Sequence, residues 1–191
     1  MRVAPMALLM AGYWSRGISF YNITQMDEAG AKVAAATHKH PLAFLPSAML
    51  THLIYDLIRL DENEIKTNFA DIALSTLQTL DRLYKGKYEK EKRFLANLTR
   101  TSVILAANDK SDAENYCAVR HIDSIEDAII SAVNHDGDSD STGAVCGNIM
   151  GAVYGYEAIK RMKLFCPQRH ELEQTLELSN IILTLADDLY T

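Results

Sequence analysis

Apolar residues recur at intervals of three to five along nearly all of this 191-residue sequence. This spacing places them on one face of an α-helix, and no segment alternates apolar and polar residues as a half-buried strand does. The pattern is clearest between residues 62 and 84, with apolar residues at Ile65, Phe69, Ile72, Leu77, Leu80 and Leu83. The sequence therefore predicts one all-α domain over residues 1–191, built from about seven or eight helices.

Several residues mark the expected helix limits. Thr24 and Asp61 can accept hydrogen bonds at a helix N-terminus, and Gly86 is suited to a helix end. Ser124 and Asp127 resemble a capping box in which Asp replaces Glu. We expect helices over residues 25–36, 41–60, 62–84, 94–107, 124–133, 142–160 and 170–189.

The formal net charge is −6. Nucleic acids and anionic membranes attract positive surfaces, so this charge argues against a general binder of either. No apolar run approaches the ~18 residues of a membrane span, and the N-terminal segment lacks the cleavage site of a signal peptide. The cysteines Cys117, Cys146 and Cys166 show no CxxC spacing, which favours buried thiols in a reducing compartment. We expect a cytoplasmic protein.

Four of the nine glycines follow one another at a spacing of four residues, at Gly143, Gly147, Gly151 and Gly155. In a helix this spacing forms one bare stripe. Each glycine costs roughly 1 kcal/mol relative to alanine in a helix interior, so a compensating interaction is needed. We expect a neighbouring helix or a ligand to lie against this stripe, and the helix to be central and buried.

An acidic loop precedes the glycine stripe, and in it Asp136, Asp138 and Asp140 alternate with small residues. One of these side chains could cap the helix. Three carboxylates repel one another unless a cation joins them, and hard oxygen donors suit Mg²⁺, Mn²⁺ or Ca²⁺. An EF-hand fails, because Ser141 stands where it needs glycine and Gly147 where it needs glutamate. An incomplete divalent-metal site is favoured over capping alone.

Three stretches together resemble the ADP-ribosylglycohydrolase family. They are "GDSDSTGAVCGNIMGAVYG" at residues 137–155, "MRVAP" at residues 1–5 and "THKHPLAF" at residues 37–44, and the closing "LADDLY" is also similar. The resemblance covers essentially the whole chain. It implies an all-α fold, a two-metal centre that usually holds Mg²⁺, and hydrolysis of the glycosidic bond that joins ADP-ribose to a modified acceptor.

The resemblance also implies roles for single residues. Asp138, Asp140 and Ser141 match the C-terminal group of metal ligands, which would hold Mg²⁺ or Mn²⁺, and His38 matches a residue that faces the bound ADP-ribose. From the residues alone, His38 and His40 are interpreted as a pair at a helix C-terminus ended by Pro41. His52 is interpreted as a core or surface histidine.

The sequence departs from the family pattern in one respect. The family carries a Thr-Asp-Asp metal cluster, a catalytic acidic residue and a Gly-rich loop upstream of its Met-Arg motif, and Met1 opens this sequence. Asp187 and Asp188 follow Ala186 and form no such triplet. We therefore expect an N-terminally incomplete domain with half of the metal centre and little activity alone. The alternatives are a non-catalytic ADP-ribose or nucleotide-binding scaffold, which assembles with itself or a complementing chain, and a Ca²⁺-binding structural module.

Overall fold

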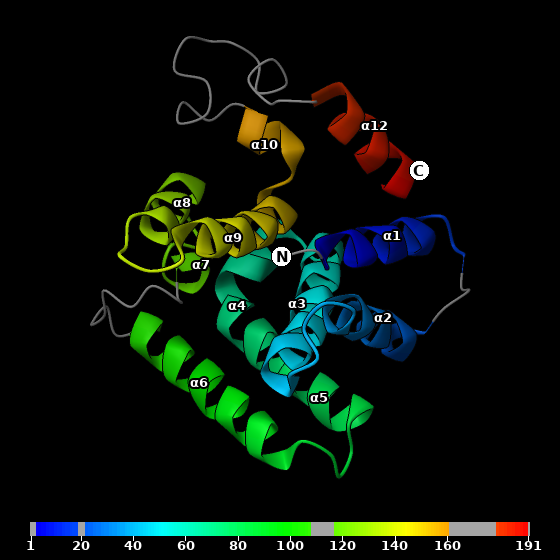
Figure 1. The fold of residues 1–191 in the computed structure, drawn as a ribbon. Helices are drawn as coiled ribbons and strands as arrows, with labels where there is room; N and C mark the ends of the chain where they lie inside the picture. Colours follow the sequence, from blue (N-terminus) through cyan, green and yellow to red (C-terminus); the bar gives the residue numbers. More distant parts are fainter. Residues whose placement is uncertain (1–2, 19–21, 108–116, 161–178, 191) are drawn as a thin grey trace.

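The regular structure is helical throughout the part of the chain that the computed structural model describes, residues 3–18, 22–107, 117–160 and 179–190 (Figure 1). This confirms the all-α prediction. The helices are α1 (Ala4–Ser15), α2 (Ile23–Ala35), α3 (Pro41–Arg59), α4 (Glu62–Ser75), α5 (Leu77–Leu83), α6 (Glu89–Ala107), α7 (Cys117–Arg120), α8 (Ile125–Val133), α9 (Ser139–Tyr154), α10 (Tyr156–Lys160) and α12 (Ser179–Tyr190).

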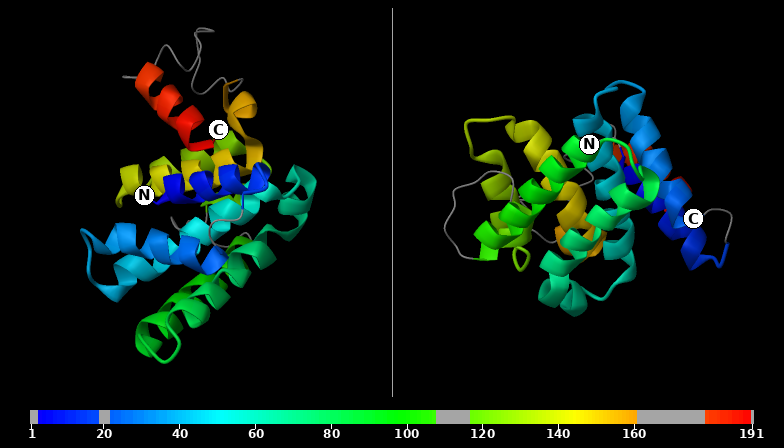
Figure 2. Two further views of the ribbon diagram at one scale, coloured as in Figure 1. Left: turned by 90° about the vertical axis from the view of Figure 1, so that its right-hand side faces the viewer. Right: turned by 90° about the horizontal axis from the view of Figure 1, so that it is seen from below.

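Helix α3 lies at the centre and contacts α1, α2, α4, α5, α6 and α9 (Figure 1). Helix α6 lies at one end of the molecule, while α10 and α12 lie at the other (Figure 2). Helix α3 is long and apolar enough to cross a membrane, which was not expected from the sequence. However, 39% of its most apolar 18-residue stretch is buried inside the protein. We interpret α3 as the core helix of the bundle.

The core consists of three clusters of buried apolar residues. One joins the C-terminal half of α3 to α4, α7, α8 and α9. A second joins α2, α3, α5 and α6, and a third joins α1 to α3. The same helix α3 therefore contributes side chains to every cluster, which explains why its sequence is apolar on most sides.

Two expected helices are each divided in two. The helix expected over 62–84 breaks at Thr76, whose hydroxyl donates to the carbonyl oxygen of Ala73 at 2.6 Å. A side chain that bonds to the preceding turn in this way competes with the helical ladder. The helix expected over 142–160 breaks at Gly155, which has a φ of +73°. This left-handed conformation favours glycine.

The expected capping residues are partly confirmed. Asp61 accepts a hydrogen bond from the N–H of Asn63 at 2.9 Å, and Ser124 accepts one from the N–H of Asp127 at 3.2 Å. Thr24 was the wrong cap for α2, because Asn22 forms a capping box with Gln25 and the helix begins at Ile23. Helix α6 begins five residues before the expected position, at Glu89, and most of the helix expected over 170–189 lies outside the described residues.

Candidate metal site and the surrounding helices

The acidic loop connects α8 to α9 and is shaped by its own hydrogen bonds. The N–H of Gly137 donates to Nδ1 of His135 at 2.9 Å. The N–H and the hydroxyl of Thr142 both donate to the carbonyl oxygen of Asp138, at 3.0 and 2.9 Å. Asp138 is therefore the residue directly before α9, and the side chains of the first turn follow it.

The three predicted ligands lie together at this first turn. The pKa of Asp138 is lowered from its ordinary value, and the largest cause is a hydrogen bond with the Asp140 side chain, followed by one with the Ser141 side chain. Two carboxyl groups that hydrogen-bond to each other share a proton, and a cation can take the place of that proton. Asp138 occupies the capping position of α9, without a capping hydrogen bond of good geometry, but the backbone N–H of Ser141 in the first turn also contributes to its lowered pKa. Capping therefore accounts for part of the role of Asp138 and leaves its proximity to the Asp140 carboxyl group unexplained.

The donors suit a hard divalent cation, because two carboxylates and a hydroxyl offer only oxygen atoms. However, the described ranges contain no group of three or more His, Cys, Asp or Glu residues that could hold a metal. Asp136, the third acidic residue of the loop, is exposed and makes no hydrogen bond or ion pair with any described residue. Asp138, Asp140 and Ser141 thus bring three oxygen-bearing side chains together at one turn of the chain.

A cavity of about 250 Å³ opens beside Ser141, between α7 and α9. Burial raises the pKa of the Cys146 thiol to about 12, and its Sγ lies 3.6 Å from the carbonyl oxygen of Ala128. Cys146 therefore stays protonated and is a packing residue, not a metal ligand. Cys117 is also buried, as the sequence predicts, and Cys166 lies outside the described residues. The cavity is lined by Cys117, Ala118, Ser141, Thr142, Val145, Cys146 and Ile149.

His38 lies in the turn between α2 and α3 and is exposed. Its Nδ1 is 2.9 Å from the hydroxyl oxygen of Thr37. This turn and the first turn of α9 lie toward the same side of the molecule (Figure 2, left), but no hydrogen bond or ion pair found among the described residues joins them. The residues alone suggested that His40 lies at a helix C-terminus, and this was wrong. His40 instead caps the N-terminus of α3, where its Nδ1 accepts a hydrogen bond from the N–H of Leu42.

The family model of the ADP-ribosylglycohydrolases matches residues 1–191. The chain belongs to the ADP-ribosylglycohydrolase family. This confirms the assignment made from the three motifs. Comparison with curated proteins and with solved structures gave no match. Membership of this family supports a glycohydrolase-like function in general, and proteins of the family use divalent metals.

The glycine stripe of this ADP-ribosylglycohydrolase family member has three different explanations. A Cβ atom on Gly143 would lie 2.8 Å from Cγ1 of Val133, so α8 approaches α9 closely there, as expected. At Gly147 and Gly151 the nearest atoms would be 3.8 and 3.7 Å away, which is ordinary contact. Both glycines line a largely apolar cavity of about 660 Å³ between α1, α3, α9 and α10. The fourth, Gly155, ends α9, so the expectation of close approach holds only at Gly143.

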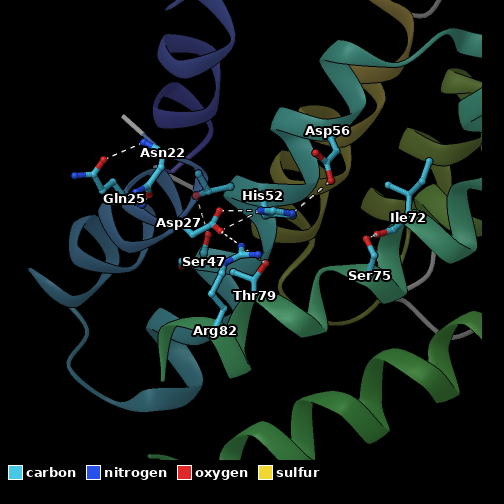
Figure 3. A network of polar contacts seen from close by, with 11 residues as sticks. Asn22, Gln25, Asp27, Ser47, His52, Asp56, Ile72, Ser75, Thr79 and Arg82 are labelled. Carbon is cyan, nitrogen blue, oxygen red and sulfur yellow. Dashed lines mark hydrogen bonds and ion pairs between the residues drawn. The ribbon is translucent and has the colours of Figure 1, made fainter. Parts of the chain in front are cut away.

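A polar network at the junction of α2, α3 and α5 was missed by the sequence analysis (Figure 3). The Asp27 carboxylate is fully buried and accepts hydrogen bonds from Nδ1 of His52 at 3.0 Å and from the Arg82 guanidinium at 2.5 Å. The other ring nitrogen of His52 lies 3.4 Å from Asp56. His52 is buried, which decides between the core and surface positions that the sequence had left open, but its partners were not anticipated. The helices α2 and α3 each contain more than one charged residue, so nothing in the sequence distinguished Asp27 or Asp56 from the others.

Proposed function

We propose that the chain supplies the Asp138–Asp140–Ser141 side of an ADP-ribosylglycohydrolase metal centre. The supporting observation is that the Asp138 carboxylate lies within hydrogen-bonding reach of both the Asp140 and the Ser141 side chains. The family reaction is metal-dependent hydrolysis of the glycosidic bond between ADP-ribose and a modified acceptor. Mg²⁺ and Mn²⁺ are the cations that suit these oxygen donors.

Each residue has a simple part in this proposal. Asp138 and Asp140 provide negative charge and two or more coordinating oxygens, and the Ser141 hydroxyl provides a neutral one. A bound Mg²⁺ would supply the positive charge that orients a water molecule or the ribose hydroxyls. His38 contacts the ADP-ribose moiety from the exposed turn between α2 and α3. The hydroxyl of Thr37 holds the His38 ring, which favours one orientation.

The 191 residues alone should bind the metal weakly and hydrolyse little. Three donors from one loop leave most of the coordination shell to water. Acid–base catalysis at a glycosidic bond also needs a carboxyl group placed beside the leaving oxygen. Among the described residues no further carboxyl group joins Asp138 and Asp140. We therefore propose metal and ADP-ribose binding with little or no turnover by this chain alone.

The test uses the purified chain with an ADP-ribosylated peptide in the presence of Mg²⁺ or of a chelator. The proposal expects little release of ADP-ribose in either condition, and substantial Mg²⁺-dependent release would contradict the inactivity. Binding of ADP-ribose is measured separately by ligand-observed NMR. It should weaken in His38→Ala and stay unchanged in Lys39→Ala, a neighbouring exposed residue. Equal binding by both variants would exclude the role of His38.

A second candidate is a non-catalytic subunit that assembles with a further copy or with another chain. It is favoured by α12, where Ile181, Ile182 and Leu185 are 51%, 49% and 56% exposed. Apolar side chains gathered on a surface helix commonly mark an interface. Light scattering over a concentration series tests this candidate: association that is lost in Leu185→Asp supports it, and a monomer at all concentrations excludes self-association.

We also propose that the protein works in the cytoplasm. The support is chemical: Cys117 and Cys146 carry buried thiols and form no disulfide with each other. Such thiols are typical of a reducing compartment. Fractionation of cells that express the tagged chain tests this location, and recovery from an oxidising compartment would contradict it.

A further inference from the structure

A row of alternating charges crosses the interior from α5 through α2 to α3 (Figure 3). It runs from Arg82 to Asp27, then to His52, and ends at Asp56. Solvent does not reach the Asp27 side chain, and it reaches 10% of the His52 side chain and 25% of the Asp56 side chain. The row is thus fully buried at Asp27 and partly exposed at both ends, Arg82 and Asp56.

The imidazole of His52 has a carboxylate at each of its nitrogens. Nδ1 lies 3.0 and 3.1 Å from the two oxygens of Asp27, and Nε2 lies 3.4 Å from Oδ2 of Asp56. A neutral imidazole carries one N–H and can donate on one side only. A doubly protonated imidazolium can donate on both sides. While both carboxyl groups are ionised, the ring can donate to both of them only when it carries both protons.

The charges that face this ring come from three helices. Asp27 is on α2, Arg82 is on α5, and Asp56 and Arg59 are on α3 with His52 itself. With the ring protonated, Arg82 and His52 balance Asp27 and Asp56. With the ring neutral, the Asp56 carboxylate loses its ion pair with His52. Burial raises the pKa of Asp56, with opposing effects from His52 and Arg59, which indicates that the ionised Asp56 depends on these cations.

We propose that Asp27, His52 and Asp56 form a proton-controlled latch that fastens α2 to α3. When His52 is doubly protonated, it joins the two carboxylates by ion pairs. When it loses the Nε2 proton, a nitrogen lone pair faces the Asp56 carboxylate and that contact becomes repulsive. The contact with Asp27 weakens at the same time, from an ion pair to a hydrogen bond with a neutral ring.

The latch acts on the pair of helices that present the exposed turn with His38. Helices α2 and α3 are consecutive, and residues 36–40 connect them. The inference does not depend on the metal site, because its residues belong to α2, α3 and α5 and the metal loop precedes α9.

The thermodynamic test compares Asp56→Asn with the wild-type chain over a range of pH. Asparagine keeps an oxygen beside Nε2 but cannot ionise. In the range where histidine is charged, near about pH 5.5, the wild type should be the more stable. Near pH ~8.5 the variant should be the more stable, because in the wild type the Asp56 carboxylate then faces the lone pair on Nε2 of a neutral His52 and the two repel each other. A difference that keeps the same sign at both pH values would overturn the latch.

The matched control repeats the comparison in a His52→Asn background. Asparagine retains a donor toward Asp27 but does not titrate, so the reversal should disappear. A reversal that persists without His52 would assign the pH dependence to another group and overturn the proposal.

A second measurement needs no folded variant at Asp56. Nitrogen-15 NMR of the histidine side chains of the wild-type chain reports the protons on each ring nitrogen, and the chain has only six histidines to assign. We expect His52 to carry both protons at low pH and to lose the one on Nε2 as the pH rises. The amide signals of Asp27 and Asp56 should shift with the same midpoint. Loss of the Nδ1 proton first, or amides that do not follow the ring, would contradict the latch.

Discussion

Gly30 of α2 lies directly against the side chain of Thr51 on α3. A Cβ atom at Gly30 would stand 2.9 Å from Cβ of Thr51 and closer still to its hydroxyl oxygen, which donates to the carbonyl oxygen of Ser47 at 2.8 Å. Thr51 is β-branched and fully buried, so its side chain cannot easily turn aside. The close packing of α2 on α3 therefore requires glycine at position 30.

Gly30→Ala should destabilise the protein by about 1–3 kcal/mol, because the extra methyl group overpacks the α2–α3 contact. Gly147→Ala is the matched control: its Cβ would meet ordinary contact, and alanine should stabilise the α9 interior by up to about 1 kcal/mol. Urea unfolding followed by circular dichroism measures both. A Gly30→Ala variant as stable as the wild type would show that α2 and α3 can separate freely.

Asp27→Asn should destabilise the protein strongly. The substitution leaves His52 and Arg82 without the carboxylate that pairs with both, and breaking a buried ion pair costs about 3–5 kcal/mol. Glu28→Gln removes the neighbouring, exposed pair with Lys32 and should cost less than about 1 kcal/mol. Thermal and urea unfolding compare the two variants. Similar losses in both would mean that the buried network contributes little.

Lys92 should make the stability sensitive to alkaline pH. Hydrogen bonds to Glu89 at 2.7 Å and to Asp81 at 2.9 Å raise the pKa of Lys92 above its ordinary value of 10.5. A raised pKa of a cation means that its stabilisation is complete below 10.5 and is lost as the pH rises through the raised value.

This pH dependence is measured as the difference in unfolding free energy between the wild type and Lys92→Gln. The advantage of the wild type should be constant below pH 10.5 and decline above it. Lys90→Gln, at an exposed neighbouring position, should show no such decline. An advantage of Lys92 that does not change at high pH would show that its charge is not what stabilises the α5–α6 contact.

The buried thiols should resist modification in the folded protein. Cys146 has a pKa of about 12, so little thiolate forms near neutral pH, and Cys117 is equally buried. In a Cys166→Ser variant, a thiol reagent should label neither residue until denaturant is added, and should then label both. Rapid labelling under native conditions would place one of these thiols at the surface.

The helices were predictable because their apolar spacing is a local property of the sequence. Asp61 and Ser124 cap their helices as expected, since a cap also acts within three residues. The breaks at Thr76 and Gly155 were not predicted. Thr76 lies between apolar residues whose helical spacing continues, and Gly155 was counted in the glycine stripe. Thr76 shows its effect only through the bond to Ala73, and Gly155 only through its positive φ.

The proximity of the proposed metal ligands was predictable because these residues are close in sequence. Asp138, Asp140 and Ser141 lie within one turn, so their proximity follows from the helix itself. The partners in the buried network are separated by 25 residues, for Asp27 and His52, and by 55, for Asp27 and Arg82. No local pattern could join them, because they meet only through the packing of α2, α3 and α5.

The most direct test of the proposed metal site is a calorimetric titration of the chelator-treated chain with Mg²⁺ and Mn²⁺, with and without ADP-ribose. We expect weak binding that disappears in Asp138→Ala and in Asp140→Ala and persists in Asp136→Ala, whose side chain lies outside the donor set. No binding at millimolar metal, or equal binding by all three variants, would contradict it.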